Sequence, residues 1–310
     1  MSSFSFKQQL DSLHFALFGW PTDHLTPLSQ LEACGDIREA AILLLNSDRF
    51  RWDIRDKVPL FAEEKWVCTE YMGLRIWVNL HDSQVSFGVL HQDWEVREAH
   101  FMTDMLNSGD TMLDIGANVG VYTLQAARAV GSTGEIHSFE PNPTVNRMLR
   151  RSITDNGFQD ICVVHEVGLA DADTPGSLHH LTGTNNVGAA YVSKSAGAGI
   201  SISLRRLDSF TFERRINFMK IDVEGYECQV LEGGSKLLGE HRPLVLAELF
   251  PCGLRNTGGR SARELVARWT DLQYKVEEFE HGRLGRVINH SNIDDYEDIV
   301  DPINVLCTPT

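Results

Sequence analysis

The strongest constraint on the fold is a glycine-rich turn between an apolar segment and a helical one. The segment Thr111-Met-Leu-Asp114-Ile runs into Gly116-Ala-Asn-Val-Gly120, and a second apolar segment, about twenty residues further on, ends in Glu140. In α/β proteins such a turn lets backbone amides approach a nucleotide-like ligand, and the second acid binds its ribose hydroxyls. The pattern therefore predicts a nucleoside site at the carboxyl ends of parallel strands.

The glycine spacing argues against a dinucleotide as the ligand. The pyrophosphate fingerprint has glycines at its first, third and sixth positions, whereas these positions hold Gly116, Asn118 and Val121. Asp114, just before the turn, would repel a pyrophosphate but suits a cation. S-adenosylmethionine (SAM) is a nucleoside that carries a sulfonium and an ammonium group. We therefore expect SAM as the ligand and methyl transfer as the chemistry.

The candidate cofactor-binding residues belong to the turn and to the two acids. They are Asp114, Gly116, Asn118, Gly120, Glu140 and Asn142. The glycines permit close backbone approach, and Asn118 tolerates a left-handed conformation. Glu140 offers two acceptor oxygens to two hydroxyls, and Asp114 is expected to orient the turn or the methionine ammonium. Asn142 is also the expected N-cap of a helix that starts at Pro143.

Composition excludes several classes of protein. The net charge of −15 argues against nucleic-acid binding, which requires a basic face, and acids surround each of the arginine pairs. The six cysteines are scattered and form no CxxC pair, so a zinc site is not expected. No leader segment and no run long enough to span a bilayer is apparent. These features predict a cytoplasmic protein with reduced thiols and no membrane span.

The chain divides into three predicted regions. Residues 1–65 read as a helical N-terminal extension, which could cap the catalytic domain, form a homodimer surface, or simply pack onto the sheet. Residues 66–93 read as a β-rich lead-in segment with three strands, and residues 94–310 as the SAM-dependent methyltransferase domain. The strands of the lead-in segment are predicted at 66–69, 74–78 and 85–89.

From Thr111 onward, strands and helices alternate, which predicts a doubly wound, mostly parallel, seven-stranded sheet. The strands are predicted at 112–115, 135–139, 161–167, 216–222, 243–249, 274–279 and 304–308. The helices are predicted at 94–107, 119–130, from 143 to about 156, from the Glu224-Gly225 turn to 239, and at 261–272. Residues 171–204, which contain Asn185 and Asn186, read as an inserted hairpin or flap that selects the acceptor.

The candidate catalytic residues are Asp222, Glu224, Glu248 and Lys220. Methyl transfer from a sulfonium is an in-line displacement that depends on alignment, but a hydroxyl acceptor must also lose its proton to a base or a metal. The three acids follow the fourth and fifth core strands, and Lys220 lies on the same side of its strand as Asp222, with which it could pair. A charge network that only fixes the loops is the alternative. Mg²⁺ would suit three carboxylates, but their spacing does not establish it and no metal ligand is assigned.

Other residues near the expected site are weaker candidates. His165, His179 and His180 fall near the rim of the sheet or in the flap, where one of them could act as a general base. Tyr122, on the first turn of the helix after the glycine turn, could line the pocket or simply pack.

These motifs together resemble the FkbM-type SAM-dependent methyltransferases, over roughly residues 94–308. The resemblance rests on segments 114–123, 139–143, 207–208, 220–227, 242–248 and 304–306. Lys220-Ile-Asp-Val-Glu-Gly225 is specific to that family, whereas the glycine turn is shared by most class I methyltransferases. The resemblance implies a Rossmann-like class I methyltransferase fold, SAM as donor, and usually a hydroxyl acceptor on a sugar, a glycan or a secondary metabolite.

Two other functions remain open at this point. Methyltransferases that act on nitrogen usually carry an Asn/Asp-Pro-Pro-aromatic turn after the fourth strand, where this chain has Asp222-Val-Glu-Gly. A non-catalytic SAM-binding module would use the N-terminal extension as its partner surface. The sequence favours an O-methyltransferase that acts on a small-molecule or glycan hydroxyl.

Overall fold

A computed structural model describes residues 64–310, except 83, 181–189, 194–198, 281 and 300. The helical extension predicted for residues 1–65 therefore lies almost entirely outside the described residues. The chain forms two compact units, of which the second comprises Glu95–His180 and Ala190–Thr310. The described part of the first unit ends at Trp94.

The first unit contains a β-hairpin, as predicted. Strands β1 (Trp66–Tyr71) and β2 (Leu74–Asn79) pair antiparallel. Met72 and Gly73 form the turn between them, with φ of 47° and 77°. Positive φ at both central residues is typical of the tight turns whose twist matches that of a hairpin.

The third strand predicted in this segment, 85–89, is wrong, because the chain forms helix α5 (Val85–His91) there. The Asp82 carboxylate accepts hydrogen bonds from the amides of Gln84 (3.1 Å) and Ser86 (2.8 Å). These amides belong to the start of the helix, where no intrahelical acceptor is available. A short apolar run is compatible with a strand or a helix, and the carboxylate upstream decides between them.

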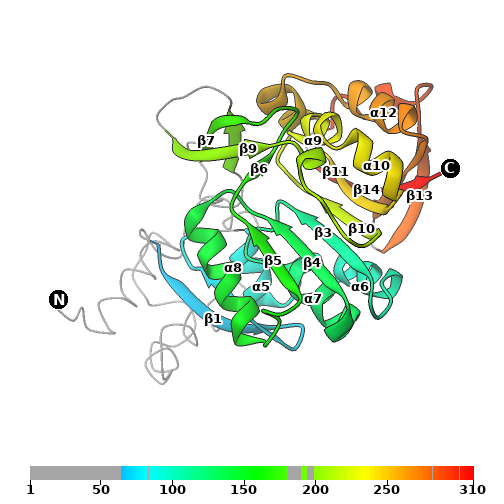
Figure 1. Ribbon diagram of the computed structural model, residues 1–310. Coiled ribbons are helices and arrows are strands. Elements are labelled where there is room, and N and C mark those ends of the chain that lie inside the picture. Colours follow the sequence, from blue (N-terminus) through cyan, green and yellow to red (C-terminus); the bar gives the residue numbers. More distant parts are fainter. Residues whose placement is uncertain (1–63, 83, 181–189, 194–198, 281, 300) are drawn as a thin grey trace, which may run out of the picture. The chain divides into compact units, whose positions relative to one another are not determined.

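The second unit is built on a sheet that, in the described residues, has eight strands in the order β13-β12-β14-β11-β10-β3-β4-β5 (Figure 1). From β5 to β11 all neighbours are parallel, whereas β14 is antiparallel to both of its neighbours and β13 is antiparallel to β12. The strands are β3 (Thr111–Ile115), β4 (Glu135–Phe139), β5 (Cys162–His165), β10 (Ile216–Ile221), β11 (Leu244–Leu249), β12 (Tyr274–Glu280), β13 (Arg283–Ile288) and β14 (Ile303–Pro309).

The doubly wound, mostly parallel sheet is confirmed, with one strand more than predicted. Strand β13 was missed because its residues are exposed up to Ile288, so the sequence shows no alternation of apolar and polar positions there. From β3 the chain moves outward to β4 and β5, then returns to β10 and moves outward the other way. The carboxyl ends of β3 and β10 thus mark the switch point, where α/β sheets bind their ligands.

Helices cover both faces of this sheet. They are α6 (Val96–Met105), α7 (Val121–Val130), α8 (Pro143–Asp155), α9 (Glu227–Gly233), α10 (Ser235–His241) and α12 (Ala262–Asp271). A single helix was predicted where α9 and α10 lie, but the chain breaks at Gly234, whose missing side chain leaves room for Leu207. Short helical turns lie at Pro251–Gly253 (α11) and Leu254–Gly258 (η3).

The core lies on the two faces of the sheet because successive strand side chains point to opposite sides. Met112, Phe218 and Leu246 belong to the buried cluster that includes α6 and α7. Leu113 and Met219 belong to the cluster that includes α9, α10 and α12. Figure 1 shows α9, α10 and α12 grouped beside β11 and β14.

The predicted inserted hairpin is part of a second, four-stranded sheet. Its order is β6 (Gly168–Leu169), β9 (Ile200–Arg205), β7 (Thr174–His180) and β8 (Ala190–Ser193), and both β8 and β9 are antiparallel to β7. Leu178, Ile202 and Leu204 form its buried side together with Tyr226, which follows β10. Asn185 and Asn186 lie outside the described residues.

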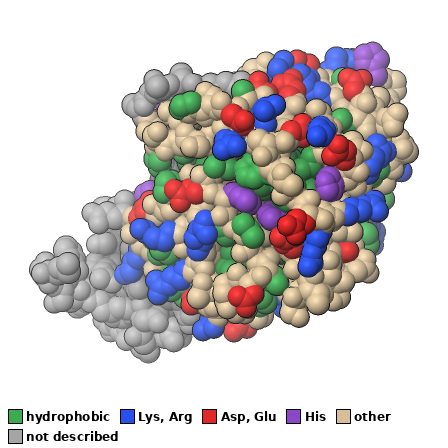
Figure 2. All heavy atoms as spheres, viewed as in Figure 1, with side chains coloured by type: hydrophobic (Ala, Val, Ile, Leu, Met, Phe, Trp, Pro, Cys, Tyr) green, Lys and Arg blue, Asp and Glu red, His purple; other side chains and the backbone are tan. Residues whose placement is uncertain are grey.

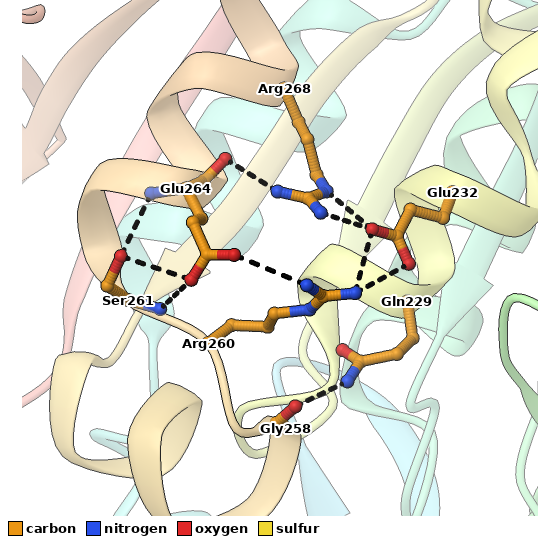
Figure 3. Close-up of polar contacts among 7 residues, drawn as sticks. All are labelled: Gln229, Glu232, Gly258, Arg260, Ser261, Glu264 and Arg268. Carbon is orange, nitrogen blue, oxygen red and sulfur yellow. Dashed lines mark hydrogen bonds and ion pairs between the residues drawn. The ribbon is translucent and has the colours of Figure 1, made fainter.

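An ion-pair network joins α9 to α12 (Figure 3). The Glu232 carboxylate accepts hydrogen bonds from Arg260 (3.1 Å) and Arg268 (2.9 Å). Ser261 and Glu264 form a reciprocal capping box at the start of α12, in which the side chain of each residue accepts a hydrogen bond from the backbone amide of the other. The network fixes the segment that enters α12.

That segment in turn presses against the loop that follows β10. The Gln229 side chain donates to the Gly258 carbonyl (2.8 Å). A Cβ at Gly258 would lie 2.4 Å from the Gly225 oxygen, and one at Gly225 would lie 2.2 Å from the Gly253 carbonyl carbon. Three glycines therefore let backbone pack on backbone at the rim of the sheet.

Replacing Glu232 should destabilise the fold more than replacing an exposed acid of the neighbouring helix. We expect Glu232→Ala to lower the free energy of unfolding by roughly 1–3 kcal/mol, because it leaves two partly buried arginines without their shared acceptor. Glu240→Ala removes only an exposed ion pair with Lys236 and should cost less than about 0.5 kcal/mol. Urea unfolding measures both, and equal losses would contradict the role given to the network.

Candidate functional site

The glycine turn has positive φ angles at three positions, a conformation that favours glycine and asparagine. Gly116, Asn118 and Gly120 have φ of 82°, 48° and 96°. A Cβ at Gly116 would lie 1.7 Å from the Asp222 carbonyl oxygen, and one at Gly120 would lie 2.3 Å from Leu149 of α8. Any side chain at Gly116 would therefore separate the ends of β3 and β10.

Glu140 follows β4 and is tied to the turn. It is 8% exposed. One carboxylate oxygen accepts from the Asn118 amide (3.0 Å) and the other from the Asn142 amide (2.7 Å). Burial raises the pKa of Glu140 to about 7, although the two amides act in the opposite direction. Each oxygen still has acceptor capacity for a further donor.

Asn142 begins α8 as predicted. Its side-chain oxygen accepts from the Thr144 amide (3.0 Å), and Pro143 occupies the first helical position. The side-chain oxygen of Asn142 is thus engaged by the helix, while its backbone amide holds Glu140. Asn142 is therefore linked to the glycine turn by its backbone amide, through Glu140, and not by its side chain.

Asp114 lies inside the sheet and does not project into solvent. It is 1% exposed and accepts a hydrogen bond from the Thr123 hydroxyl (2.5 Å), which also lies 2.7 Å from the Ser138 hydroxyl. Burial raises the pKa of Asp114 to about 6, and the Thr123 hydrogen bond partly opposes this rise. Asp114 therefore joins β3 to the first turn of α7.

Lys220 is a buried cation at the centre of the site. It is 1% exposed and is the register partner of Asp114 in the parallel pair of β10 and β3. Its Nζ lies 3.4 Å from the Asp222 carboxylate and 5.2 Å from the centre of the Tyr122 ring. Burial lowers the pKa of Lys220, but Asp222 and other carboxylates outweigh this and raise it above its ordinary value. The predicted pairing with Asp222 is present.

The remaining acids gather beyond β10 and β11. Burial, reinforced by Asp222, raises the pKa of Glu224 to about 8, and burial raises the pKa of Glu248 well above its ordinary value. One Glu248 oxygen is buried and has no hydrogen-bond partner among the described residues. Burial thus favours the uncharged, protonated forms of these carboxyl groups.

Glu227 and Glu95 belong to the same group of acids and were missed by the sequence analysis. One Glu227 oxygen accepts from the Val223 (3.3 Å) and Gly225 (3.2 Å) amides, and burial raises the pKa of Glu227 to about 7. Glu227 could have been found as an acid in the first turn of the helix after the motif. Glu95 precedes α6 and carries no such signal.

The candidate histidines belong to strands β5 and β7. His165 stacks on Phe139, with ring centres 4.5 Å apart, and its Nε2 lies 3.2 Å from Nδ1 of His137. Burial lowers the pKa of His165 to about 4, so its ring is neutral at physiological pH. His179 lies on β7, opposite Tyr191 of β8, and the side chain of His180 is outside the described residues.

Among the residues that the structure describes, no three His, Cys, Asp or Glu side chains are arranged to hold a metal ion. No described helix has the length and apolar character needed to cross a bilayer.

The doubly wound sheet, the glycine turn at its switch point and the acid after the next strand define the class I SAM-dependent methyltransferases. Residues 114–288 match the Methyltransferase FkbM domain, and the chain belongs to this family. Its cofactor is SAM. A search of the curated proteins finds no significant match.

Solved structures that are similar to this chain include the following three. A SAM-dependent O-methyltransferase of Thermotoga maritima is 14% identical, with 69% of this chain and 65% of that chain covered and a TM-score of 0.41. Methyltransferase FkbM of Methylobacillus flagellatus KT is 17% identical, with coverage of 73% and 54% and a TM-score of 0.41. Fibrillarin of Aeropyrum pernix, solved with bound SAM, is 13% identical, with coverage of 68% and 73% and a TM-score of 0.40. This chain spans less than two thirds of the first two proteins.

The raised carboxyl pKa values predict that the cofactor-free protein loses stability between about pH 6.5 and 8. Glu140, Glu224 and Glu227 bind protons in the folded state within this window, whereas in the unfolded chain they are ionised above about 4.5. The folded state then binds more protons, so its stability falls as pH rises. Below pH 6.5, the lowered pKa of His165 makes the stability rise with pH, because the unfolded chain then binds the additional proton.

Thermal unfolding at pH 6.5 and 8 checks this prediction. Glu224→Gln should make the fall in melting temperature smaller, because it removes one group that must ionise in the folded state. The exposed Glu213→Gln should leave the fall as it is. A melting temperature that rises from pH 6.5 to 8 would contradict the prediction.

Proposed function

We propose that the protein transfers the methyl group of SAM to a hydroxyl group of a sugar, a glycan or a secondary metabolite. The observation that carries the proposal is the group of acids at the carboxyl ends of β10 and β11. Among them, Glu224 has a pKa of about 8, close to neutral pH. A carboxyl group tuned to this range is suited to take a proton from an acceptor hydroxyl during transfer.

The residues at the switch point fit SAM. The backbone of Gly116, Asn118 and Gly120 lines the turn without side chains that would block close approach, and Glu140 offers both oxygens to the ribose hydroxyls. The buried Asp114 fixes the turn to α7 through Thr123. Bound in this way, SAM supplies the methyl group on its sulfonium.

The acceptor side of the site is assigned to β10 and β11. The Asp222 side chain is 31% exposed, so it can orient an acceptor hydroxyl while the buried Lys220 holds its carboxylate. Glu224 takes the proton, and Glu248, with its unpartnered buried oxygen, is a further acceptor for a substrate hydroxyl. The small sheet β6-β9-β7-β8 contacts Tyr226 directly after these acids, which supports its role in acceptor selection.

Other acceptors and partners are less well supported. The Asp222-Val-Glu-Gly turn lacks the Pro-Pro-aromatic pattern of enzymes that methylate nitrogen. On the face drawn in Figure 2, the coloured basic and acidic side chains are interspersed, which does not favour a nucleic acid. A cytoplasmic location, which the scattered cysteines favour, and a homodimer through residues 1–65 are further proposals. A non-catalytic SAM-binding module is the alternative function.

Glu140→Ala should abolish most of the cofactor affinity. Loss of two charge-assisted hydrogen bonds to the ribose is expected to cost about 3 kcal/mol, or roughly a hundredfold in Kd. Calorimetric titration with S-adenosylhomocysteine measures it, and the exposed Glu213→Ala is the control of equal charge change. Unchanged affinity in folded Glu140→Ala would contradict the assignment of the ribose site.

Formation of S-adenosylhomocysteine in the presence of hydroxylated sugars and metabolites tests the transfer itself, with and without Mg²⁺. With an accepted substrate, Glu224→Gln should lower kcat about a hundredfold or more, because the proton acceptor is lost, and should leave S-adenosylhomocysteine affinity intact. Transfer to amines alone would refute the hydroxyl acceptor. Tight cofactor binding without transfer to any compound would favour the non-catalytic module.

A further inference from the structure

Glu95 lies at the entrance to α6 in a conformation unusual for a glutamate. Its φ is 47°, in the left-handed region, and its carbonyl accepts the first helical hydrogen bond from Ala99 (2.9 Å). Helices α6 and α7 pack against each other over the same face of the sheet. The Glu95 carboxylate is thereby placed beside Tyr122, in the first turn of α7.

Tyr122 supplies a buried polar atom at this place. Its side chain is 6% exposed, and its hydroxyl faces the Glu95 carboxylate without a hydrogen bond of normal geometry. The Nζ of Lys220 lies 5.2 Å from the ring centre. The Tyr122 hydroxyl is therefore available to a neighbour that completes the site.

The charges around Lys220 do not balance. Its single positive charge interacts with the carboxylates of Asp222, Glu95, Glu248 and Asp114. Asp222 forms the direct ion pair at 3.4 Å, so the Glu95 carboxylate is left without a direct partner of opposite charge among the described residues. Burial raises the pKa of the half-buried Glu95, so a cation that arrives with a ligand would favour its charged form.

The position of the cluster matches one end of the cofactor. Glu140 follows β4, and β10 lies two strands away in the order β10-β3-β4, a distance of about 10 Å at the usual strand spacing. If the ribose binds at Glu140 and the methionine portion extends across the glycine turn of β3 toward β10, its ammonium group would reach the side on which Glu95 and Asp222 lie.

We infer that Glu95 binds the ammonium group of the methionine portion of SAM, with Asp222 as the second acceptor and Lys220 holding Asp222 in place. In the bound state, the Tyr122 hydroxyl would donate to the Glu95 carboxylate and orient it. This inference rests on the proposed cofactor site and adds to it a residue outside every motif of the family resemblance.

The test compares two ligands that share the adenosine and its sulfur. S-adenosylhomocysteine carries the ammonium group, whereas 5′-methylthioadenosine lacks the whole amino-acid portion. In calorimetric titrations, Glu95→Gln should weaken S-adenosylhomocysteine binding tenfold or more and change methylthioadenosine binding less than twofold. Tyr122→Phe should give a smaller loss with the same selectivity. Asp104→Asn, an exposed acid on the same helix, is the control and should change neither.

Each other outcome overturns the inference. Equal weakening of both ligands by Glu95→Gln would assign the residue a structural role, and unchanged binding of both would remove it from the site. If Glu95→Gln does not fold, selectivity between the two ligands has to appear in Tyr122→Phe, and its absence there counts against the inference. If the wild-type protein binds neither ligand, the proposed cofactor site itself is refuted. If the wild-type protein binds S-adenosylhomocysteine and the variants bind it with the same affinity, only the role of Glu95 is refuted.

Discussion

The close contact between the ends of β3 and β10 is the constraint on which the rest of the site depends. Gly116 leaves no room for a side chain against the Asp222 carbonyl, and the Asp222 amide donates to the Ile115 carbonyl (3.0 Å). The glycine turn, the proposed cofactor site, and the loop that bears the candidate catalytic acids are therefore one backbone structure. Lys220 then lies beside Asp114 and Asp222, and a single buried cation serves the strands on both sides of the switch point.

The electrostatics of the site follow from this arrangement. Several carboxyl groups are removed from water at the ends of neighbouring strands, with one buried ammonium group to offset them. Burial disfavours their ionised forms, and neighbouring acids reinforce the effect for Glu224 and Glu248. A ligand with two positive centres would reduce that cost, which supports the proposal that SAM binds beside these acids. Perturbed acids of this kind are characteristic of active sites.

Sequence reasoning succeeded where a feature is encoded locally. The helix start at Asn142 lies within a few residues of the amides that it caps, and Glu140 follows the glycine turn at the spacing typical of this fold, so the spacing carried the information. It failed where the local pattern is ambiguous or absent, and where distant residues decide. Asp82 turns an apolar run into α5, and strand β13 carries no apolar pattern because its outer positions are exposed. Glu95 reaches Tyr122 and Lys220 only through the packing of α6 on α7, which no spacing in the chain records.

The stacked glycines beside the candidate catalytic acids have a consequence for how acceptors of different size are accommodated. Gly225, Gly253 and Gly258 meet backbone to backbone, and the Glu232 network fastens the segment behind them. This wall has no side chain that could be enlarged or trimmed to reshape it, and it can shift only if the entry to α12 shifts too. In the proposed site, the space open to an acceptor would therefore be varied by other elements, such as the strands of the small sheet, while this wall stays constant.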